Sequence, residues 1–194
     1  FDDAIDVIEE ETTEDIEMMA AITPTDKPYL KTSVFEIWKK RIPWLLLLMI
    51  SATFTTLIIS SFESALAAQL VLTSCMPMIM GTGGNSGSQS SVTIIRGLSL
   101  DEIEFSDILR VIWKETRVAI LCGRTLAVAN FFKLILFEGV EVAISLTISL
   151  TLLITVLVAK VIGSSLPMLA KKIGFDPAVM ASPLITTMVD ALSL

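Results

Sequence analysis

Residues 64–95 form a run of thirty-two residues without a charged side chain. A stretch this apolar indicates a membrane-embedded segment. Its centre, Gly81-Thr82-Gly83-Gly84-Asn85-Ser86-Gly87-Ser88-Gln89, is nevertheless a poor helix sequence. Irregular backbone at membrane depth survives where protein buries it or where it lines a water-filled path. The segment therefore predicts a channel or transporter. We expect Gly83, Gly84 and Gln89 to line the path and Asn85 to offer a side-chain oxygen to a cation.

The composition places the chain among polytopic all-α membrane proteins. Hydrophobic residues make up 53% of it, and the mean hydropathy of +0.75 lies outside the range of soluble globular domains. The chain has no histidine, which excludes histidine metal sites, histidine proton relays and serine–histidine catalysis. Its two cysteines, Cys75 and Cys122, lie in apolar segments and are interpreted as core residues.

The negative charge is concentrated at the N-terminus. Residues 1–31 hold ten acidic and two basic side chains, a balance of −8, whereas the rest holds eleven acidic and twelve basic ones, a balance of +1. Apolar residues recur at helical spacing over residues 1–22, which predicts an amphipathic helix. We interpret residues 1–31 as an acidic cytosolic linking helix that attracts cations and has no affinity for nucleic acid.

The remainder, residues 32–194, is predicted to be the transmembrane domain. A short interfacial helix is expected over residues 32–41. The five predicted spans cover residues 42–62, 65–95, 118–137, 142–166 and 177–194. The second would be about 46 Å long as one helix, against a hydrocarbon core of roughly 30 Å. We therefore expect a kink or an unwound stretch near Pro77 and the glycines.

Basic residues predict the orientation of the spans. They gather before the first span, between the second and third, and between the fourth and fifth, whereas the other two loops carry Glu63, Glu138 and Glu141. Because basic loops stay on the cytosolic side, the N-terminus is predicted to be cytosolic, in a multi-pass protein of the plasma or inner membrane.

The last predicted span carries an intramembrane acid. Asp176 followed by Pro177 is a favourable helix start. Ser182, Thr186 and Asp190 follow at intervals of four and share one face of a helix. A carboxylate inside a membrane is costly and marks a functional site, here a metal site in a pore. The alternative is that Asp190 reaches the outer interface, roughly 20 Å beyond Pro177.

Several of these motifs together resemble the MgtE family of magnesium channels. The matching pieces are Phe62-Glu63-Ser64, the run from Pro77 to Gln89, Arg96-Gly97, and the segment from Asp176-Pro177 to Asp190. Asp2-Asp3 and Thr13-Glu14-Asp15-Ile16 resemble the helix that links that family's cytosolic CBS domain to the membrane. The resemblance extends over essentially the whole chain.

The resemblance implies a homodimer of five-helix subunits in the lipid bilayer, with the ion path at the dimer interface between the second and fifth spans. It implies Asp190 as the pore carboxylate and a carbonyl ligand from Thr186, whereas family members often have asparagine where this chain has the candidate ligand Ser182. It implies regulatory Mg²⁺ beside Asp3, Asp6, Glu14 and Asp15, and CBS-type cytosolic domains as partners.

The chemistry of the residues agrees with a hydrated divalent ion. Mg²⁺ keeps several waters and is bound through one or two carboxylates. One Asp190 from each subunit of a dimer supplies that number. Oxygen ligands also suit Mn²⁺ and Ca²⁺, which are the expected competitors. We therefore expect Mg²⁺ to enter the cytosol down its electrochemical gradient.

Two rival functions remain open. The first is transport of Mg²⁺ coupled to Na⁺ or H⁺, which a single intramembrane carboxylate disfavours. The second is an intramembrane enzyme, because Gly84-Asn85-Ser86-Gly87 matches the GxSG pattern of rhomboid proteases. That chemistry needs a base beside the serine, and an aspartyl protease needs two aspartates, so we expect no enzyme.

Overall fold

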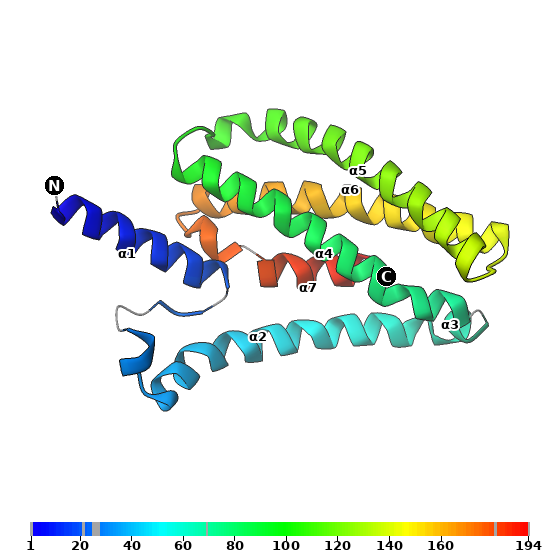
Figure 1. Cartoon of the computed structure of the whole chain (residues 1–194), viewed down its shortest axis with the longest axis horizontal. Helices are drawn as coiled ribbons and strands as arrows, with labels where there is room; N and C mark the ends of the chain where they lie inside the picture. Colours follow the sequence, from blue (N-terminus) through cyan, green and yellow to red (C-terminus); the bar gives the residue numbers. More distant parts are fainter. Residues whose placement is uncertain (1, 21, 25–27, 69, 181, 194) are drawn as a thin grey trace.

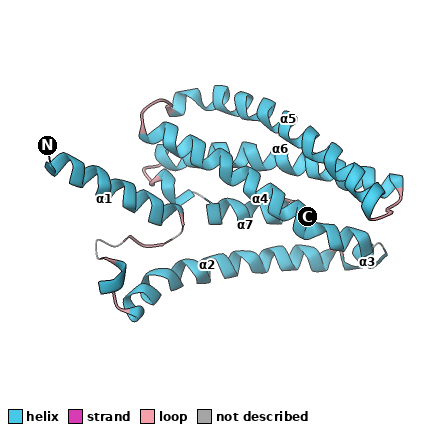
Figure 2. Cartoon of the chain, viewed as in Figure 1, coloured by secondary structure: helices cyan, strands magenta, loops and turns pink. Residues whose placement is uncertain are grey.

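The computed structural model describes residues 2–20, 22–24, 28–68, 70–180 and 182–193; for residues 2–6, 9, 10, 65, 68 and 182 it describes the backbone only. All regular structure in these ranges is helical, with no strand (Figure 2). The predicted all-α class is confirmed. In Figure 1, α4, α5 and α6 run side by side, α7 lies against α4, and α2 runs along the other side of α7.

Three described helices are long and apolar enough to cross a membrane. They cover Val34–Ser61, Phe105–Phe137 and Val142–Lys172, and a shorter apolar stretch covers Pro177–Leu192. Lengths and composition therefore fit an all-α membrane protein. Apolar side chains of these helices remain exposed on the outside, which suits a hydrocarbon solvent.

The first long helix, α2 (Val34–Ser61), begins earlier than predicted. Residues 32–41 do not form a separate interfacial helix, because α2 continues through Pro43. Ser33 caps it, with its hydroxyl accepting a hydrogen bond from the Glu36 amide at 3.2 Å. Pro43 falls in the third turn and removes one amide donor without ending the helix. The short α3 (Glu63–Ala68) follows.

The glycine-rich segment is a continuous helix, α4 (Leu70–Ser99), so the predicted unwound stretch is not found there. Low helix propensity is measured against water, whereas in a membrane interior an unpaired backbone group has no such alternative partner. Pro77 also lies inside the helix without breaking it. Packing of α4 between α6 and α7 supplies contacts that propensity does not.

The next two helices extend beyond their predicted spans. α5 (Ile108–Phe137) begins ten residues before the predicted start, after the 3₁₀ turn η2 (Phe105–Asp107), and α6 (Val142–Lys172) ends six residues after the predicted end. The added turns carry charged residues, because a helix can continue past the apolar layer. One core cluster joins Cys75 and Ile79 of α4 to Leu134 and Ile148.

The chain then makes the 3₁₀ turn η3 (Pro177–Met180) before α7 (Ser182–Leu192). The predicted cap by Asp176 is confirmed, since its Oδ1 accepts a hydrogen bond from the Ala178 amide at 2.8 Å. The predicted α-helix from Pro177 onward is wrong, because its first turn is 3₁₀. α7 itself therefore has eleven residues.

The acidic N-terminal segment forms α1 (Asp2–Met19), as predicted for residues 1–22. Its C-terminal end reaches η3, and a linker leads back to the start of α2 (Figure 1). The Thr23 amide donates to the Lys40 carbonyl at 3.4 Å, and the Lys40 ammonium donates to the Pro24 carbonyl. The short 3₁₀ turn η1 (Tyr29–Lys31) lies in this linker.

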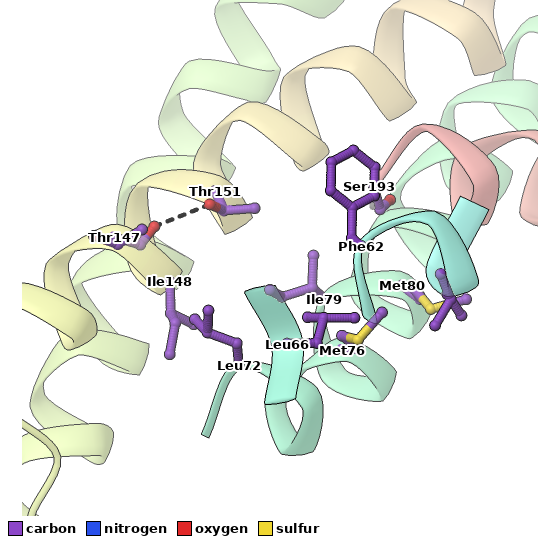
Figure 3. Close-up of a pocket in the computed structure, with 11 residues that line it drawn as sticks. Phe62, Leu66, Leu72, Met76, Ile79, Met80, Thr147, Ile148, Thr151 and Ser193 are labelled. Carbon is purple, nitrogen blue, oxygen red and sulfur yellow. Dashed lines mark hydrogen bonds between the residues drawn. The ribbon is translucent and has the colours of Figure 1, made fainter. Parts of the chain in front are cut away.

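A cavity of 210 Å³ separates the α2–α3 turn from α4 and α6 (Figure 3). Phe62, Leu66, Met76 and Met80 give it an apolar wall. The Thr151 hydroxyl at its edge donates to the carbonyl of Thr147, 3.0 Å away. Such a lining offers a hard cation few ligands, so the candidate site is sought elsewhere.

Candidate cation site between α4 and α7

The glycines of α4 form the surface on which α7 packs. A Cβ atom at Gly83 would lie 2.8 Å from Val189 Cγ1, and one at Gly84 would lie 2.9 Å from Thr186 Cγ2. At separations below 3.0 Å something must shift, here either the Val189 and Thr186 side chains or the helices that carry them. Both glycines lie inside an α-helix, so their role is close approach. Side chains of α7 make this approach.

The glycine face of α4 also meets α6, where Gly87 of α4 lies against Gly163 of α6. A Cβ atom at Gly163 would overlap the carbonyl group of Gly87, lying 2.8 Å from its carbonyl carbon. A Cβ atom at Gly87 would lie 3.1 Å from the Ala159 carbonyl oxygen. The two backbones are therefore in direct contact, as at other glycine crossings in membranes. α4 is held between α6 and α7.

One stripe of α4 remains uncovered by the described residues of the chain. Asn85, Gln89 and Thr93 recur at intervals of four and are all exposed. We call these three residues the polar stripe. An amide-bearing face turned out of the bundle is costly in lipid, so it needs water, an ion or a protein partner.

Asp190 lies on α7, next to the contact between Val189 and Gly83. Its side chain is partly buried. Within the described part of the chain, its Oδ1 atom is buried and accepts no hydrogen bond. Thr186, one turn earlier on the same face, contacts the Gly84 position. An unpaired carboxylate oxygen is unfavourable unless a water or a cation satisfies it.

The predicted ligands are only partly brought together. Thr186 and Asp190 share a face of α7 beside α4, and Asn85 lies on α4 next to Gly84. The side chain of the predicted ligand Ser182 lies outside the described residues. Among the described side chains, no three carboxylates or thiols are grouped closely enough to hold a metal ion.

The predicted regulatory carboxylates lie on α1. The side chains of Asp3 and Asp6 are outside the described residues, whereas Glu14 and Asp15 are half-buried. Burial raises the pKa of Asp15, and the negative charges of Asp176 and Glu11 raise it further. The last turn of α1 therefore brings a carboxylate near Asp176, at the start of η3.

Sequence reasoning did not find a buried ion pair behind α4. Lys160 of α6 and Glu115 of α5 approach to 3.9 Å, with Ser90 of α4 between them. Lys160 is a charge within the predicted span 142–166, which is the signal that a partner must exist. Glu115 carries no such signal, because it lies before the predicted start of the third span at residue 118.

Known proteins match the region that contains this site. The family model for MgtE, described as a divalent cation transporter, matches residues 76–194. That range includes the polar stripe, the glycines of α4 and all of α5, α6 and α7.

Curated relatives match the whole chain. Proteins named magnesium transporter MgtE are 35% identical in Thermus thermophilus, 36% in Bacillus subtilis and 31% in Enterococcus faecalis. Each alignment covers 100% of this chain and 42% of the relative, so the chain spans about two fifths of their length. With the family model matching more than half of its residues, the chain belongs to the MgtE family of divalent cation transporters.

Proposed function

We propose that this protein carries Mg²⁺ across the membrane through a path lined by α4 and α7. The observation that carries the proposal is that α4 exposes an uncharged polar stripe while the adjoining α7 carries Asp190, whose Oδ1 is buried without a hydrogen bond in the described part of the chain. Both occur in a chain of a divalent cation transporter family whose relatives are named as magnesium transporters.

The chemistry of these residues suits a hydrated ion. Asp190 accepts hydrogen bonds from waters held by the cation or contacts the cation directly, and Thr186 and Asn85 add neutral oxygens. Mg²⁺ prefers few carboxylates and retained waters. A path of amides and hydroxyls with one carboxylate per chain stabilises the ion without trapping it, a condition that conduction requires.

The path is proposed to lie between two copies of the chain. The polar stripe is uncovered within one chain, and a second copy placed on it buries both stripes around one axis. The proposal also includes a linking segment that ends at residue 31 and a transmembrane domain of five spans. These spans are formed in order by α2, by α3 with α4, by α5, by α6, and by η3 with α7. Basic loops favour a cytosolic N-terminus, in the plasma or inner membrane, and inward movement of Mg²⁺.

Flux into liposomes tests this function. Purified protein is reconstituted into vesicles loaded with a Mg²⁺-sensitive dye, and Mg²⁺ is added outside with identical Na⁺ and pH on both sides. We expect dye fluorescence to report Mg²⁺ entry that empty vesicles lack. Vesicles containing protein that stay as tight to Mg²⁺ as empty ones contradict the proposal.

The same assay separates passive from coupled transport. If entry needs an opposing Na⁺ or H⁺ gradient, the protein is a coupled transporter. Flux that depends only on the Mg²⁺ gradient and the membrane potential supports a channel. The single carboxylate of α7 leaves little room for a second ion site, and this favours passive movement.

Contact of α1 with η3 is proposed to regulate the path. Asp15 and Asp176 carry like charges at this contact, and burial adds to the cost of ionising Asp15. A divalent cation beside Asp3, Asp6, Glu14 and Asp15 relieves the repulsion and holds α1 against the transmembrane helices. The cation can favour this state only by binding it more tightly than the undocked one.

Protons are expected to strengthen the same contact. The pKa of Asp15 is raised when α1 is docked, so the protonated form favours docking. As pH falls through the docked-state pKa toward the ordinary carboxyl pKa, docking gains free energy, and as pH rises above the docked-state value this gain is lost. Fluorescence quenching between probes on α1 and on the loop before α5 measures docking against pH without Mg²⁺.

The Asp15→Asn variant provides the decisive comparison for this pH dependence. It removes the titrating group, so docking should become nearly independent of pH. Glu63→Gln is the matched control, because that acid lies on α3, far along the chain from η3. A pH profile unchanged by Asp15→Asn would show that another group controls docking.

A further inference from the structure

Three side chains from three helices meet behind α4. The ammonium of Lys160 on α6 donates to the hydroxyl of Ser90 on α4 at 3.2 Å. That hydroxyl donates to Glu115 Oε2 on α5 at 2.6 Å, and the ammonium lies 3.9 Å from the same oxygen. The Lys160 and Glu115 side chains are 6% and 13% exposed. We call these three residues the positioning cluster.

The cluster is a poor device for stability alone. Burying two charges costs desolvation that their attraction only partly recovers, and apolar replacements of such pairs are often as stable or more stable. An ionic cluster does favour one relative orientation of the three helices, because its hydrogen bonds form only in that arrangement. Buried polar groups are best attested as devices that set register.

The neighbouring serine, Ser91, anchors α4 in a second direction. Ser91 is fully buried, and its hydroxyl donates to the carbonyl oxygen of Met180 in η3 at 3.1 Å. Ser90 thus forms hydrogen bonds with side chains of α5 and α6, and Ser91 forms one with η3, the turn that leads into α7. Adjacent residues of a helix point about 100° apart, so two such anchors define the rotation of α4 about its axis.

This rotation determines what α4 presents to α7. Ser90 follows Gly83 by seven residues and Ser91 follows Gly84 by seven, which is two turns, so each serine shares a face with its glycine. If α4 turned by one residue, Asn85 would replace Gly84 against Thr186. A Cβ atom at Gly84 would already lie 2.9 Å from Thr186 Cγ2, so α7 would have to move away from α4 to admit the asparagine side chain.

We propose that Lys160, Ser90 and Glu115 set the rotation of α4 and thereby determine which face of α4 packs on α7 and in which direction the polar stripe faces. They are positioning residues that act through α4 and do not contact the cation. The consequence for transport rests on the proposed function, but the rotation itself is a structural quantity that can be measured without any flux.

Distances between spin labels test the rotation. In a background with Cys75→Ala and Cys122→Ala, one label is placed at the exposed Thr93 of α4 and one at the exposed Leu109 of α5. A second pair, at Leu109 and the exposed Ile154 of α6, reports whether α5 and α6 stay together. Labelled protein is diluted with unlabelled protein so that distances within one chain dominate.

Two variants remove the cluster differently. Ser90→Ala removes the central hydroxyl, and Glu115→Gln with Lys160→Met removes both charges while keeping the volumes. We expect both to shift the α4–α5 distance by about 5 Å, the scale of a helix radius, with the α5–α6 distance unchanged. Ser90→Thr keeps the hydroxyl and should keep the parent distance. The double variant is expected to stay as resistant to thermal unfolding as the parent, a result that a merely stabilising pair would not give.

The remaining outcomes are also decisive. An unchanged α4–α5 distance in both variants overturns the proposal. A change in both label pairs assigns the cluster to general packing and overturns it as well. If the parent protein transports no Mg²⁺, the proposed function fails. The spin-label distances then still test whether the cluster sets the rotation of α4. If the parent conducts and the shifted variants conduct equally, rotation occurs but does not matter for transport, and the proposed link is wrong.

Discussion

Replacing Asp190 with asparagine is expected to lower Mg²⁺ flux by about tenfold or more. The amide keeps the volume and removes the charge, so each hydrogen bond from an ion-bound water loses its charge-assisted strength of about 1.5 kcal/mol or more, which corresponds to at least about tenfold. The same change should leave thermal unfolding unaltered or slightly raise its midpoint, because Oδ1 of Asp190 is buried and has no hydrogen-bond partner among the described residues. Dye-loaded liposomes and thermal unfolding in detergent measure the two effects.

Asp101→Asn is the matched control for Asp190→Asn. Asp101 is an exposed acid with a φ of 53°, a conformation that asparagine adopts readily. Its carboxylate lies 3.5 Å from the exposed Lys171 ammonium, a surface pair of small energetic value. Flux should match the parent in this variant. Equal flux in Asp190→Asn and the parent would remove Asp190 from the ion path.

Adding one methyl group at Gly163 is expected to be the most damaging small change to the fold. The new Cβ atom would overlap the carbonyl group of Gly87, whose carbonyl carbon would be 2.8 Å away. Backbone atoms on both sides cannot turn aside, so α4 and α6 must separate along their contact. We expect the free energy of unfolding to fall by about 1–3 kcal/mol or more, and flux to fall with it.

Gly81→Ala is the comparison for the stability effect of Gly163→Ala. It lies on α4, and a Cβ atom there meets nothing within 4 Å. Alanine favours a helix over glycine by roughly 1 kcal/mol, so unfolding should be unchanged or slightly harder. Unfolding in detergent at increasing denaturant compares the two variants. Equal losses at both positions would mean that glycine itself, and not the contact between α4 and α6, is what the helix requires.

The sequence by itself determined that the protein is an all-α membrane protein and which side chains are available to bind a cation. Uncharged runs are long because hydrocarbon excludes charge, and the cap at Asp176 is encoded within three residues. The shared face of Thr186 and Asp190 follows from helical spacing alone. These features depend on neighbours along the chain or on the membrane as solvent, so no knowledge of the fold was needed to predict them.

Only the tertiary structure decided what the glycines and buried charges do. The length of the second predicted span, together with its glycines and Pro77, predicted a kink or an unwound stretch, but in α4 the backbone pairs with itself without interruption and α6 and α7 pack against it. The sequence around Gly87 does not predict that Gly163 is its partner, and the sequence around Lys160 does not predict Glu115. Those partners are 76 and 45 residues away along the chain. Which faces meet is set by the packing of whole helices, and spacing within one segment does not contain that information.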